Sequence, residues 1–512
     1  MAAEASSIVL RLTGITKRFG PLLANDAISL DLHRGEVLAL LGENGAGKTT
    51  LMNILFGHYV ADEGAIEVFG EKLPPGSPRA ALECGIGMVH QHFTLADNLT
   101  VLDNVLLGTE HLWRVHSGRA KARALLAELS ESFGLRVKPD ARIADLSVGE
   151  RQRVEILKAL YRDARILILD EPTAVLTPQE TEALFATLQK LVERGLAIIF
   201  ISHKLNEVMA VSRRVVVLRQ GKLVAERDTA KTDRHELAEL MVGRPIPEPK
   251  VEPIPLGPVV LALKAVSLTG DGHPRLQDVS LDLHGNEIVG IAGVSGNGQG
   301  ALADLVSGIV APSGGSLSIF GQEIHSFDPA RMVSYGIGRI PEDRHAVGVV
   351  GDLSLEENLI SARYREPPFS RRGLIDWTAV RDFASRIIAD YDVRCPGPQA
   401  ATRLLSGGNM QKLILGREMA RDPRIILANQ PTRGLDIGAV GYVHQQLLKA
   451  RAEGSGILLI SEDLDELLAL SDRVVVMYRG RMSPAMRRSD VTIRQLGMMM
   501  AGHGFAGEAH AA

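Results

Sequence analysis

Residues 42–49 read Gly-Glu-Asn-Gly-Ala-Gly-Lys-Thr and match the pattern G-x-x-x-x-G-K-S/T. Glycines let backbone N–H groups curl around phosphate oxygens, and the start of a helix adds a positive dipole end. Lys48 would neutralise the β- and γ-phosphates, and the Thr49 hydroxyl would face Mg²⁺. The weaker alternative is a glycine-rich turn before a structural helix. We therefore expect ATP and Mg²⁺ to bind here, and the candidate residues are Gly42, Glu43, Asn44, Gly45, Ala46, Gly47, Lys48, Thr49 and Thr50.

Two adjacent carboxylates, Asp170 and Glu171, follow the apolar segment from Ile166 to Leu169. Asp170 is expected to join the Mg²⁺ shell, and Glu171 to polarise the attacking water as general base. Gln91 would reach both metal and water, and His203 would contact the γ-phosphate. A lone Gln or His after a strand is more often a structural hydrogen bonder, so these two count only because they complete the set.

A third motif, Leu146 to Gln152, reads LSVGERQ and starts a predicted helix. Ser147 at the N-cap and Glu150 three residues later fit a capping box. That structural role is enough to explain both residues. The same exposed N–H groups could also bind phosphate.

The chain repeats itself. GIGMVHQ (85–91) returns as GIGRIPE (336–342), a shift of 251, and LSVGERQ (146–152) returns as LSGGNMQ (405–411), a shift of 259. Six prolines fall between Pro245 and Pro258, and proline-rich segments are semi-rigid linkers. We therefore predict a first domain at 1–243, a linker at 244–258, a second domain at 259–503 and a flexible tail at 504–512.

The motifs stand where apolar segments of strand length end. Such segments include Val37 to Leu41, Ile198 to Ile201 and Val215 to Leu218, with counterparts in the second copy. Apolar runs bounded by polar loops indicate a sheet buried on both faces, hence an α/β fold. A more helical region lies between the early and late strands. Its apolar stripe is predicted to be packing and comprises Val380, Phe383, Ile387, Ile388 and Tyr391.

Composition narrows the class of protein. With 512 residues, 45% hydrophobic and 23% charged, the chain is typical of a globular protein rather than a disordered one. A net charge of -4 disfavours a nucleic-acid partner. Two cysteines, Cys84 and Cys395, cannot build a disulfide framework and favour a reducing compartment. We expect neither a signal peptide nor a membrane-spanning helix.

In this order and in duplicate, the motifs resemble the ATP-binding subunits of ABC transporters, over about residues 8 to 502. The resemblance implies two tandem ATPase domains, each with a mainly parallel core sheet, an antiparallel β subdomain and a helical subdomain. It further implies a peripheral protein on the cytoplasmic face of the membrane, seated under two permease subunits and served by an external solute-binding protein. Segments such as MVHQHF (88–93) and ANQPTRGLD (428–436) look most like nucleoside importers, with ribose-type sugar importers close behind.

The second copy departs from the catalytic pattern. By the offsets, Lys48 and Thr49 become Gln299 and Gly300, and Gln91 becomes Glu342. Asp170 and Glu171 become Asn429 and Gln430, and His203 becomes Glu462. So many losses at one site predict that the second copy cannot hydrolyse ATP and binds Mg²⁺ poorly.

In the family that the chain resembles, the motifs LSVGERQ (146–152) and LSGGNMQ (405–411) correspond to a sequence called the signature. ATP lies between the phosphate loop of one domain and the signature of the other. The resemblance therefore implies one competent composite site, in which Ser406, Gly407, Gly408 and Asp436 of the second copy complete the first copy's site. Phe19 stands at the family's adenine-stacking position, although core packing is an equal alternative. Its counterpart is Gly270, which has no ring.

Soluble tandem ABC ATPases that act on ribosomes or DNA are a further alternative. They usually keep both carboxylate pairs and often have a long charged linker. Here the second copy has Asn429 and Gln430, and the linker is short and proline-rich. Co-purification with permeases rather than with ribosomes or DNA would separate the classes.

Overall fold

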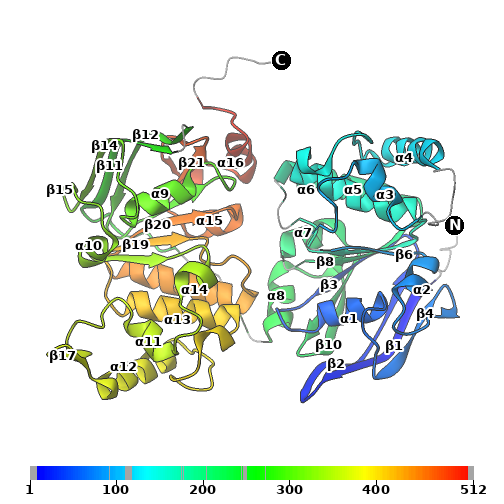
Figure 1. Ribbon diagram of the computed structural model, residues 1–512, viewed down its shortest axis with the longest axis horizontal. Helices are drawn as coiled ribbons and strands as arrows, with labels where there is room; N and C mark the ends of the chain where they lie inside the picture. Colours follow the sequence, from blue (N-terminus) through cyan, green and yellow to red (C-terminus); the bar gives the residue numbers. More distant parts are fainter. Residues whose placement is uncertain are drawn as a thin grey trace. The chain divides into compact units, whose positions relative to one another are not determined.

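The computed structural model describes residues 8–90, 93–109, 118–173, 176, 178–202, 204–243, 245, 251–270 and 273–505. The chain divides into two compact units, Met1–Ile246 and Pro247–Ala512, here called unit 1 and unit 2 (Figure 1). The division falls within the segment predicted as a linker, of which residues 244 and 246–250 lie outside the described part. None of the helices in the described part combines the length and hydrophobicity needed to cross a membrane.

Unit 1 contains two sheets. An antiparallel sheet has the order β2-β1-β4-β5 and comprises β1 (Ile8–Phe19), β2 (Leu22–His33), β4 (Glu63–Val68) and β5 (Glu71–Lys72). The core sheet has the order β10-β9-β3-β8-β7-β6, and all its neighbours are parallel except β9 and β10. Its strands are β3 (Val37–Leu41), β6 (Ile86–Val89), β7 (Ile166–Asp170), β8 (Ala197–Ile201), β9 (Arg214–Arg219) and β10 (Lys222–Asp228).

The helices of unit 1 fall into two groups. One group packs on the core sheet and comprises α1 (Lys48–Leu55), α2 (Pro78–Glu83), α6 (Pro178–Glu193), α7 (Leu205–Val211) and α8 (Arg234–Val242). The other group forms a helical lobe whose members contact one another: α3 (Val101–Leu106), α4 (Arg119–Phe133) and α5 (Val148–Tyr161). Short 3-10 turns occur at η1 (Ile143–Asp145) and η2 (Thr229–Lys231).

Unit 2 repeats the plan of unit 1. Its antiparallel sheet has the order β12-β11-β14-β15 and comprises β11 (Val259–Gly270), β12 (His273–His284), β14 (Gly314–Ile319) and β15 (Gln322–Glu323). Its core sheet has the order β16-β19-β20-β13-β21-β22, and β23 also pairs with β21. These strands are β13 (Ile288–Ala292), β16 (Ile337–Ile340), β19 (Ile425–Asn429), β20 (Gly456–Ser461), β21 (Arg473–Tyr478), β22 (Arg481–Met482) and β23 (Met486–Arg487).

The helices of unit 2 match those of unit 1 in order. Those against the core are α9 (Gln299–Val306), α10 (Pro329–Ser334), α14 (Ile437–Ala452), α15 (Leu464–Leu470) and α16 (Ile493–Met500), and those of the lobe are α11 (Leu355–Ile360), α12 (Trp377–Asp390) and α13 (Gly407–Met419). The 3-10 turns are η4 (Thr402–Leu404) and η5 (Arg488–Asp490). In α12, Val380, Phe383 and Ile387 are buried, as the predicted packing stripe requires.

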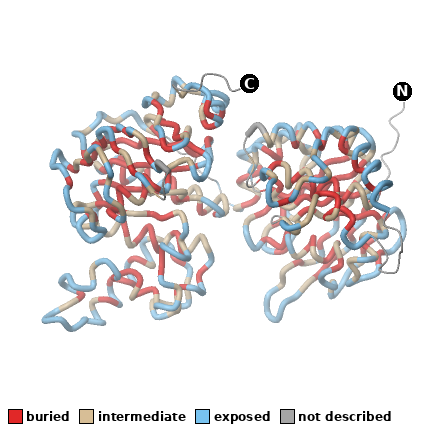
Figure 2. The backbone as a smooth tube through the Cα atoms, turned by 45° about the horizontal axis from the view of Figure 1, so that its top comes forward, coloured by how far each residue is buried: buried red, intermediate tan, exposed pale blue. Residues whose placement is uncertain are grey.

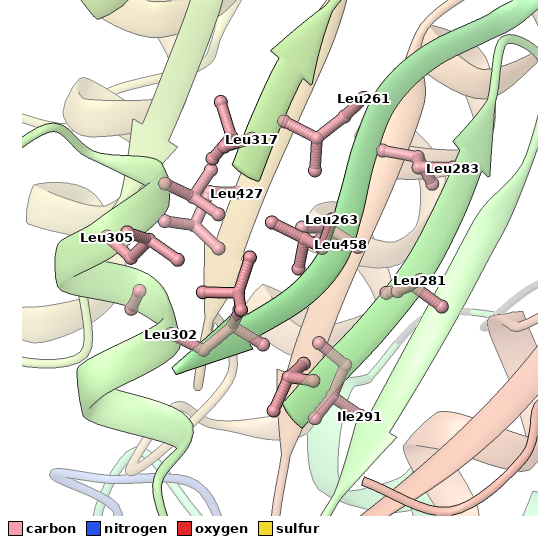
Figure 3. Close-up of a cluster of buried hydrophobic side chains, with 14 of the residues drawn as sticks. Leu261, Leu263, Leu281, Leu283, Ile291, Leu302, Leu305, Leu317, Leu427 and Leu458 are labelled. Carbon is pink, nitrogen blue, oxygen red and sulfur yellow. The ribbon is translucent and has the colours of Figure 1, made fainter. Parts of the chain in front are cut away.

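Each core sheet is buried on both faces, as the apolar runs predict. All five residues of β3 and all five of β13 are buried, and Figure 2 shows buried segments running through the interior of each unit. Figure 3 shows how α9 packs on the core of unit 2. Leu302 and Leu305 of this helix lie beside Leu427 of β19 and Leu458 of β20. Full burial of one such side chain contributes about 1.5–3 kcal/mol. This packing holds the start of the helix at the ends of the strands.

The two units differ by insertions in the helical lobe. Helix α11 begins 15 residues after the end of β16, whereas α3 begins 12 residues after β6. The longer segment contains a π-helical turn, η3 (Arg344–Gly348). Helix α12 begins 17 residues after α11 ends, against 13 for the unit 1 pair, and there the hairpin of β17 (Ser370–Arg371) and β18 (Leu374–Ile375) is added. These insertions account for most of the change in repeat offset from 251 to 259.

Candidate active site

The phosphate loop of unit 1 joins β3 to α1 and curls around the ammonium group of Lys48. Gly45 and Gly47 have φ of 83° and 99°, a conformation that L side chains rarely adopt. A Cβ on Gly47 would lie 2.6 Å from Nδ2 of Asn25, a buried side chain on β2. The same Nδ2 donates to the Gly47 carbonyl at 3.1 Å. Asn25, which sequence reasoning missed, therefore supports the loop from the neighbouring sheet.

Lys48 is buried and lies among backbone acceptors. Its Nζ donates to the carbonyl oxygens of Gly42 at 2.6 Å and Glu43 at 3.1 Å. Burial lowers the pKa of Lys48, and the nearby carboxylates of Glu171, Asp170 and Glu43 oppose that shift. The ammonium group is thus held by the loop in the position from which it would contact phosphate oxygens.

Asp170 and Glu171 lie at the carboxyl end of β7, as predicted. Burial raises the pKa of Asp170, the neighbouring Glu171 raises it further, and Lys48 opposes both effects. Glu171 has a φ of 46°, and its backbone N–H donates to the carbonyl oxygen of Ile201 at 2.9 Å. Such a left-handed conformation in a non-glycine residue is a form of strain that persists where the surrounding structure imposes it. It turns the Glu171 side chain away from the path of the strand.

The remaining candidates in unit 1 vary in how far the structure describes them. Thr49 is exposed and Thr50 half-buried in the first turn of α1, so the Thr49 hydroxyl is open to a ligand. The Phe19 ring is 41% exposed and meets the Tyr59 ring edge-on at 5.5 Å. This exposure favours a stacking surface over core packing. Gln91 and His203 lie outside the described residues.

A buried carboxylate that sequence reasoning missed connects two of the site's loops. Glu207 on α7 accepts from the Thr173 hydroxyl at 2.5 Å and from the Ser202 hydroxyl at 2.9 Å. Thr173 follows Glu171 by two residues, and Ser202 directly precedes His203. Unit 2 repeats half of this contact, since the Thr432 hydroxyl donates to Glu466 at 2.7 Å.

The signature helices, α5 in unit 1 and α13 in unit 2, begin differently. In unit 1, Glu150 N–H donates to the Ser147 hydroxyl at 3.3 Å and Ser147 N–H donates to the Glu150 carboxylate at 2.9 Å, so the predicted capping box is confirmed. The hydrogen bond from Ser147 N–H to the carboxylate lowers the pKa of Glu150. In unit 2 the Ser406 hydroxyl forms no cap on its helix and accepts instead from Asn409 Nδ2 at 2.9 Å.

The starts of α5 and α13 therefore differ in charge. A carboxylate covers the start of α5 in unit 1, and that start is therefore unsuited to an anion. In unit 2 the equivalent position holds the neutral Asn409, while Ser406 is exposed and Gly407 and Gly408 are half-buried. A helix start whose N–H groups are not covered by a carboxylate of the same helix can bind phosphate. Asp436 lies nearby as the N-cap of α14, and its Oδ1 accepts from Ala439 N–H at 2.8 Å.

Comparison with known proteins decides the family. The family model described as "ABC transporter" matches residues 25–174 and 276–433, which cover the phosphate loop and carboxylates of unit 1 and the signature of unit 2. The chain belongs to the ABC transporter family. As a member of that family it binds nucleotide and is an ATPase.

Three curated relatives in the ABC transporter family align over nearly their whole length. The chain is 42% identical to the nucleoside import ATP-binding protein NupA of Lactococcus lactis, over 97% of this chain and 99% of the relative. It is 44% identical to the guanosine import ATP-binding protein NupO of Bacillus subtilis, over 96% and 97%. It is 40% identical to a ribose import ATP-binding protein of Streptomyces avermitilis, over 94% and 92%.

The second unit of this ABC transporter protein keeps the shape of the catalytic site and loses its charges. A cavity of about 570 Å³ lies at the start of α9. There Gln299 replaces Lys48, and its Nε2 donates to the carbonyl oxygen of Val294 at 3.0 Å. Gln430 replaces Glu171 and keeps the same backbone geometry, with a φ of 50°. The backbone geometry is kept, whereas the Lys48 ammonium group and the Glu171 carboxylate are replaced by neutral amides.

The adenine position of unit 2 is also changed. A Cβ on Gly270, the counterpart of Phe19, would lie 2.7 Å from Cδ of Arg275. The Arg275 side chain therefore occupies the space next to that position. Glu342, the counterpart of Gln91, forms an ion pair with Arg433. This ABC transporter protein thus has unequal units, and the described side chains support catalysis at the phosphate loop of unit 1 only.

Proposed function

We propose that the protein energises the import of nucleosides by hydrolysing ATP at one composite site. Unit 1 contributes the phosphate loop, Asp170 and Glu171, and unit 2 contributes Ser406, Gly407, Gly408 and Asp436. The observation that carries this proposal is the difference between the signature helices. Glu150 covers the helix start in unit 1, whereas Asn409 leaves the helix start in unit 2 open.

The residues of unit 1 fit a magnesium site. The carboxylate of Asp170 is close to that of Glu171, so a bound cation would stabilise its ionised form. The exposed Thr49 hydroxyl is a second oxygen ligand. Within the described residues no group of three or more His, Cys, Asp or Glu side chains could hold a metal. That fits Mg²⁺, which takes few protein ligands and completes its shell with water and phosphate. When bound, Mg²⁺ would be held by Asp170 and Thr49 and would offset negative charge on the phosphates. By resemblance, Gln91 is the third ligand.

The chain's own residues perform the remaining steps. Lys48 binds the β- and γ-phosphates, and Phe19 stacks on adenine. Glu171 accepts a proton from the attacking water while the bond from the γ-phosphorus to the bridging oxygen breaks, and ADP departs with the electron pair. Gln91 orients the water, and His203 contacts the γ-phosphate. Closure on ATP and reopening after hydrolysis would drive the permeases between two states.

The relatives' names, which describe import ATP-binding proteins, support partners in a membrane import system. Two transmembrane permease subunits would hold the protein on the cytoplasmic face of the membrane, and an external solute-binding protein would deliver the solute. The identities of 42% and 44% with nucleoside and guanosine import proteins favour nucleosides. Ribose is the second candidate because a ribose import protein is 40% identical. Measuring the binding of guanosine, adenosine and ribose to the partner solute-binding protein separates the two.

The decisive test compares two residues at equivalent positions. Glu171→Gln should lower ATP turnover by about 10²–10⁴-fold while ATP binding survives, because only the general base is lost. Gln430→Ala is the matched variant in unit 2 and should leave turnover nearly unchanged. Equal damage from both variants would contradict a single competent site. Co-purification with ribosomes or DNA instead of permeases would contradict the transport role.

A further inference from the structure

Arg344 lies beside the signature of unit 2, although it belongs to none of the motifs described above. It begins η3, the π-helical turn inserted between β16 and α11. Its guanidinium donates to the carbonyl oxygen of Arg433. A Cβ on Gly407 would lie 3.7 Å from its NH1, and a Cβ on Gly434 would lie 3.4 Å from its NH2. The guanidinium therefore sits between the start of α13 and the loop that leads to α14.

One donor of this guanidinium is unsatisfied. The NH1 of Arg344 is buried and has no hydrogen-bond partner within the described residues. The two nearest acids in sequence have other partners: the Asp343 carboxylate accepts from His345 and Ala346 N–H groups at 2.9 Å, and Glu342 pairs with Arg433. A buried cationic donor without an acceptor is costly, and arginine stays charged at neutral pH. Such a group indicates an anion that is present when the protein works.

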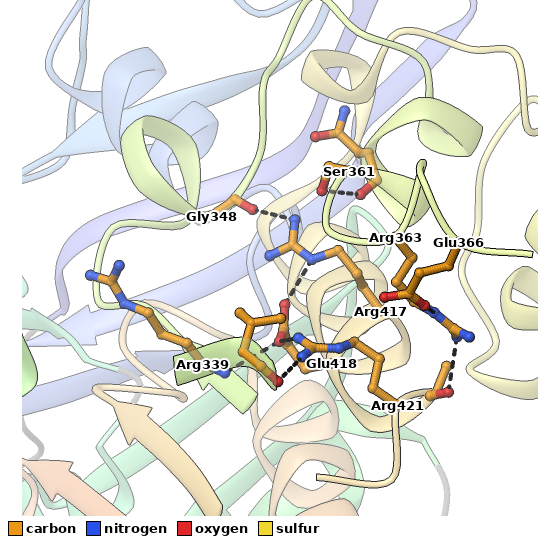
Figure 4. Close-up of polar contacts among 11 residues, drawn as sticks. Arg339, Gly348, Ser361, Arg363, Glu366, Arg417, Glu418 and Arg421 are labelled. Atoms are coloured by element: carbon orange, nitrogen blue, oxygen red, sulfur yellow. Dashed lines mark hydrogen bonds and ion pairs between the residues drawn. The ribbon is translucent and has the colours of Figure 1, made fainter. Parts of the chain in front are cut away.

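The inserted turn is fastened to the signature helix at its other end. Arg417 on α13 donates through NH1 to the carbonyl oxygen of Gly348 at 2.9 Å and through Nε to Glu418 at 2.8 Å (Figure 4). Glu418 also accepts from the backbone N–H of Arg339 on β16 at 3.3 Å. The turn, the helix and the core sheet thus form one network. This support holds Arg344 at a defined place relative to Ser406, as a preorganised site requires.

Within its described residues, unit 1 has no arginine at the position of Arg344. By the offset of 251, the residue at the position of Arg344 is Phe93, and the insertion that contains η3 is missing. Glu150 covers the helix start there. An extra cation, Arg344, and the loss of the capping acid therefore occur together at the start of α13. Asp436, where unit 1 has Thr177, brings a carboxylate oxygen to 3.9 Å from a Cβ on Gly408. The buried NH1 of Arg344 favours an anion bound at this helix start.

We propose that Arg344 is a catalytic residue that binds the terminal phosphate of ATP at the start of α13, beside Ser406 and the N–H groups of Gly407 and Gly408. This inference rests on the proposed function, since it takes that helix start as the phosphate site. NH1 donates to a non-bridging oxygen of the terminal phosphate. As water oxygen bonds to phosphorus and the bond to the bridging oxygen breaks, the guanidinium offsets the charge on the equatorial oxygens. The water proton goes to Glu171, since arginine cannot act as a base.

The test measures ATP and ADP affinity separately, because only ATP has the terminal phosphate. In the full chain carrying Glu171→Gln, with Mg²⁺ present, Arg344→Gln should weaken ATP binding by roughly tenfold to hundredfold. ADP affinity should change less than twofold. Arg403→Gln is the matched control, because Arg403 is an exposed arginine three residues before Ser406 and pairs only with exposed Asp352. It should leave both affinities unchanged.

A second set of measurements separates phosphate binding from a structural role. Arg344→Lys keeps the charge and should recover part of both the ATP affinity and the turnover that Arg344→Gln loses. If Arg344 only fastens the Arg433 loop, ATP and ADP affinities should fall together and the Tm should drop with them, and the proposal is then wrong. If Arg344→Gln leaves ATP affinity unchanged while Glu171→Gln and Ser406→Ala still lower ATP turnover, this inference is overturned and the proposed function stands.

Discussion

The ammonium group of Lys48 lies 2.6 Å from the carbonyl oxygen of Gly42, so the phosphate loop holds its own cation in place. Lys48 also donates to the carbonyl oxygen of Glu43 at 3.1 Å, and in unit 2 the amide of Gln299 donates to Val294, the counterpart of Glu43, at 3.0 Å. The two loops therefore share a shape that does not depend on the charge. Function at this position should depend on the charge alone.

Replacing each of these two side chains tests this dependence on charge. Lys48→Gln should keep the loop's shape and lower ATP affinity by about tenfold to hundredfold, because charge-assisted hydrogen bonds to phosphate are lost. Gln299→Ala should leave ATP affinity at the catalytic site unchanged. Equilibrium titration with a fluorescent ATP analogue measures both. A large effect of Gln299→Ala, with no change in Tm, would contradict the assignment of catalysis to unit 1.

Asn409→Glu should separate stability from activity. A glutamate at this position can form a capping box with Ser406, as Glu150 does with Ser147, and caps contribute about 0.5–2 kcal/mol. We expect a Tm that is equal or higher and a turnover that falls by more than about tenfold, because a carboxylate would then repel phosphate at the helix start. Thermal unfolding and phosphate release are the measurements. The reciprocal variant, Glu150→Asn, should destabilise α5 slightly and not raise turnover. Full activity in Asn409→Glu would count against the phosphate role of this helix.

Glu207→Gln should lower kcat more than it changes ATP affinity. The variant weakens the acceptor that holds Thr173 and Ser202, and so loosens the loops that present Glu171 and His203. A misplaced catalytic group costs about tenfold to hundredfold in rate. Glu466→Gln makes the matched change in unit 2, where Thr432 donates to the same carboxylate position, and should spare kcat. A fall in ATP affinity equal to the fall in kcat would show that Glu207 does not act by positioning the catalytic loops.

Asp170→Asn should stabilise the nucleotide-free protein at neutral pH and abolish Mg²⁺-dependent turnover. Because burial and Glu171 raise the pKa of Asp170 above its ordinary 3.8, the ionised form is disfavoured in the folded state. The unfolding free energy of the unmodified protein therefore falls as the pH rises through the pKa that Asp170 has in the folded state. Below pH 3.8 Asp170 is protonated in both states, so the stability advantage of Asp170→Asn should disappear there. Tm measured against pH tests this. Asp140→Asn is the contrast, because Arg123 lowers the pKa of Asp140 and its removal should bring no gain.

Much of the site could be predicted from sequence because its chemistry is local. The phosphate loop, the carboxylates after β7 and the capping box at Ser147 are each contiguous, and backbone geometry over a few residues gives them their form. The alternation of buried strands and polar loops likewise predicted β3, β7 and β8. Even the loss of catalytic groups in unit 2 needed only the repeat offset.

The repeat in the sequence is enough to predict two similar α/β units and to assign the expected catalytic residues to the first. The fold was needed to find the side chains that reach the site from distant segments: Asn25 under Gly47, Glu207 between Thr173 and Ser202, and Arg344 beside Gly407. The physical reason is that these contacts join residues that lie tens of positions apart, and no local pattern encodes them. Whether a buried donor such as Arg344 NH1 has a partner can be known only after the chain has folded around it.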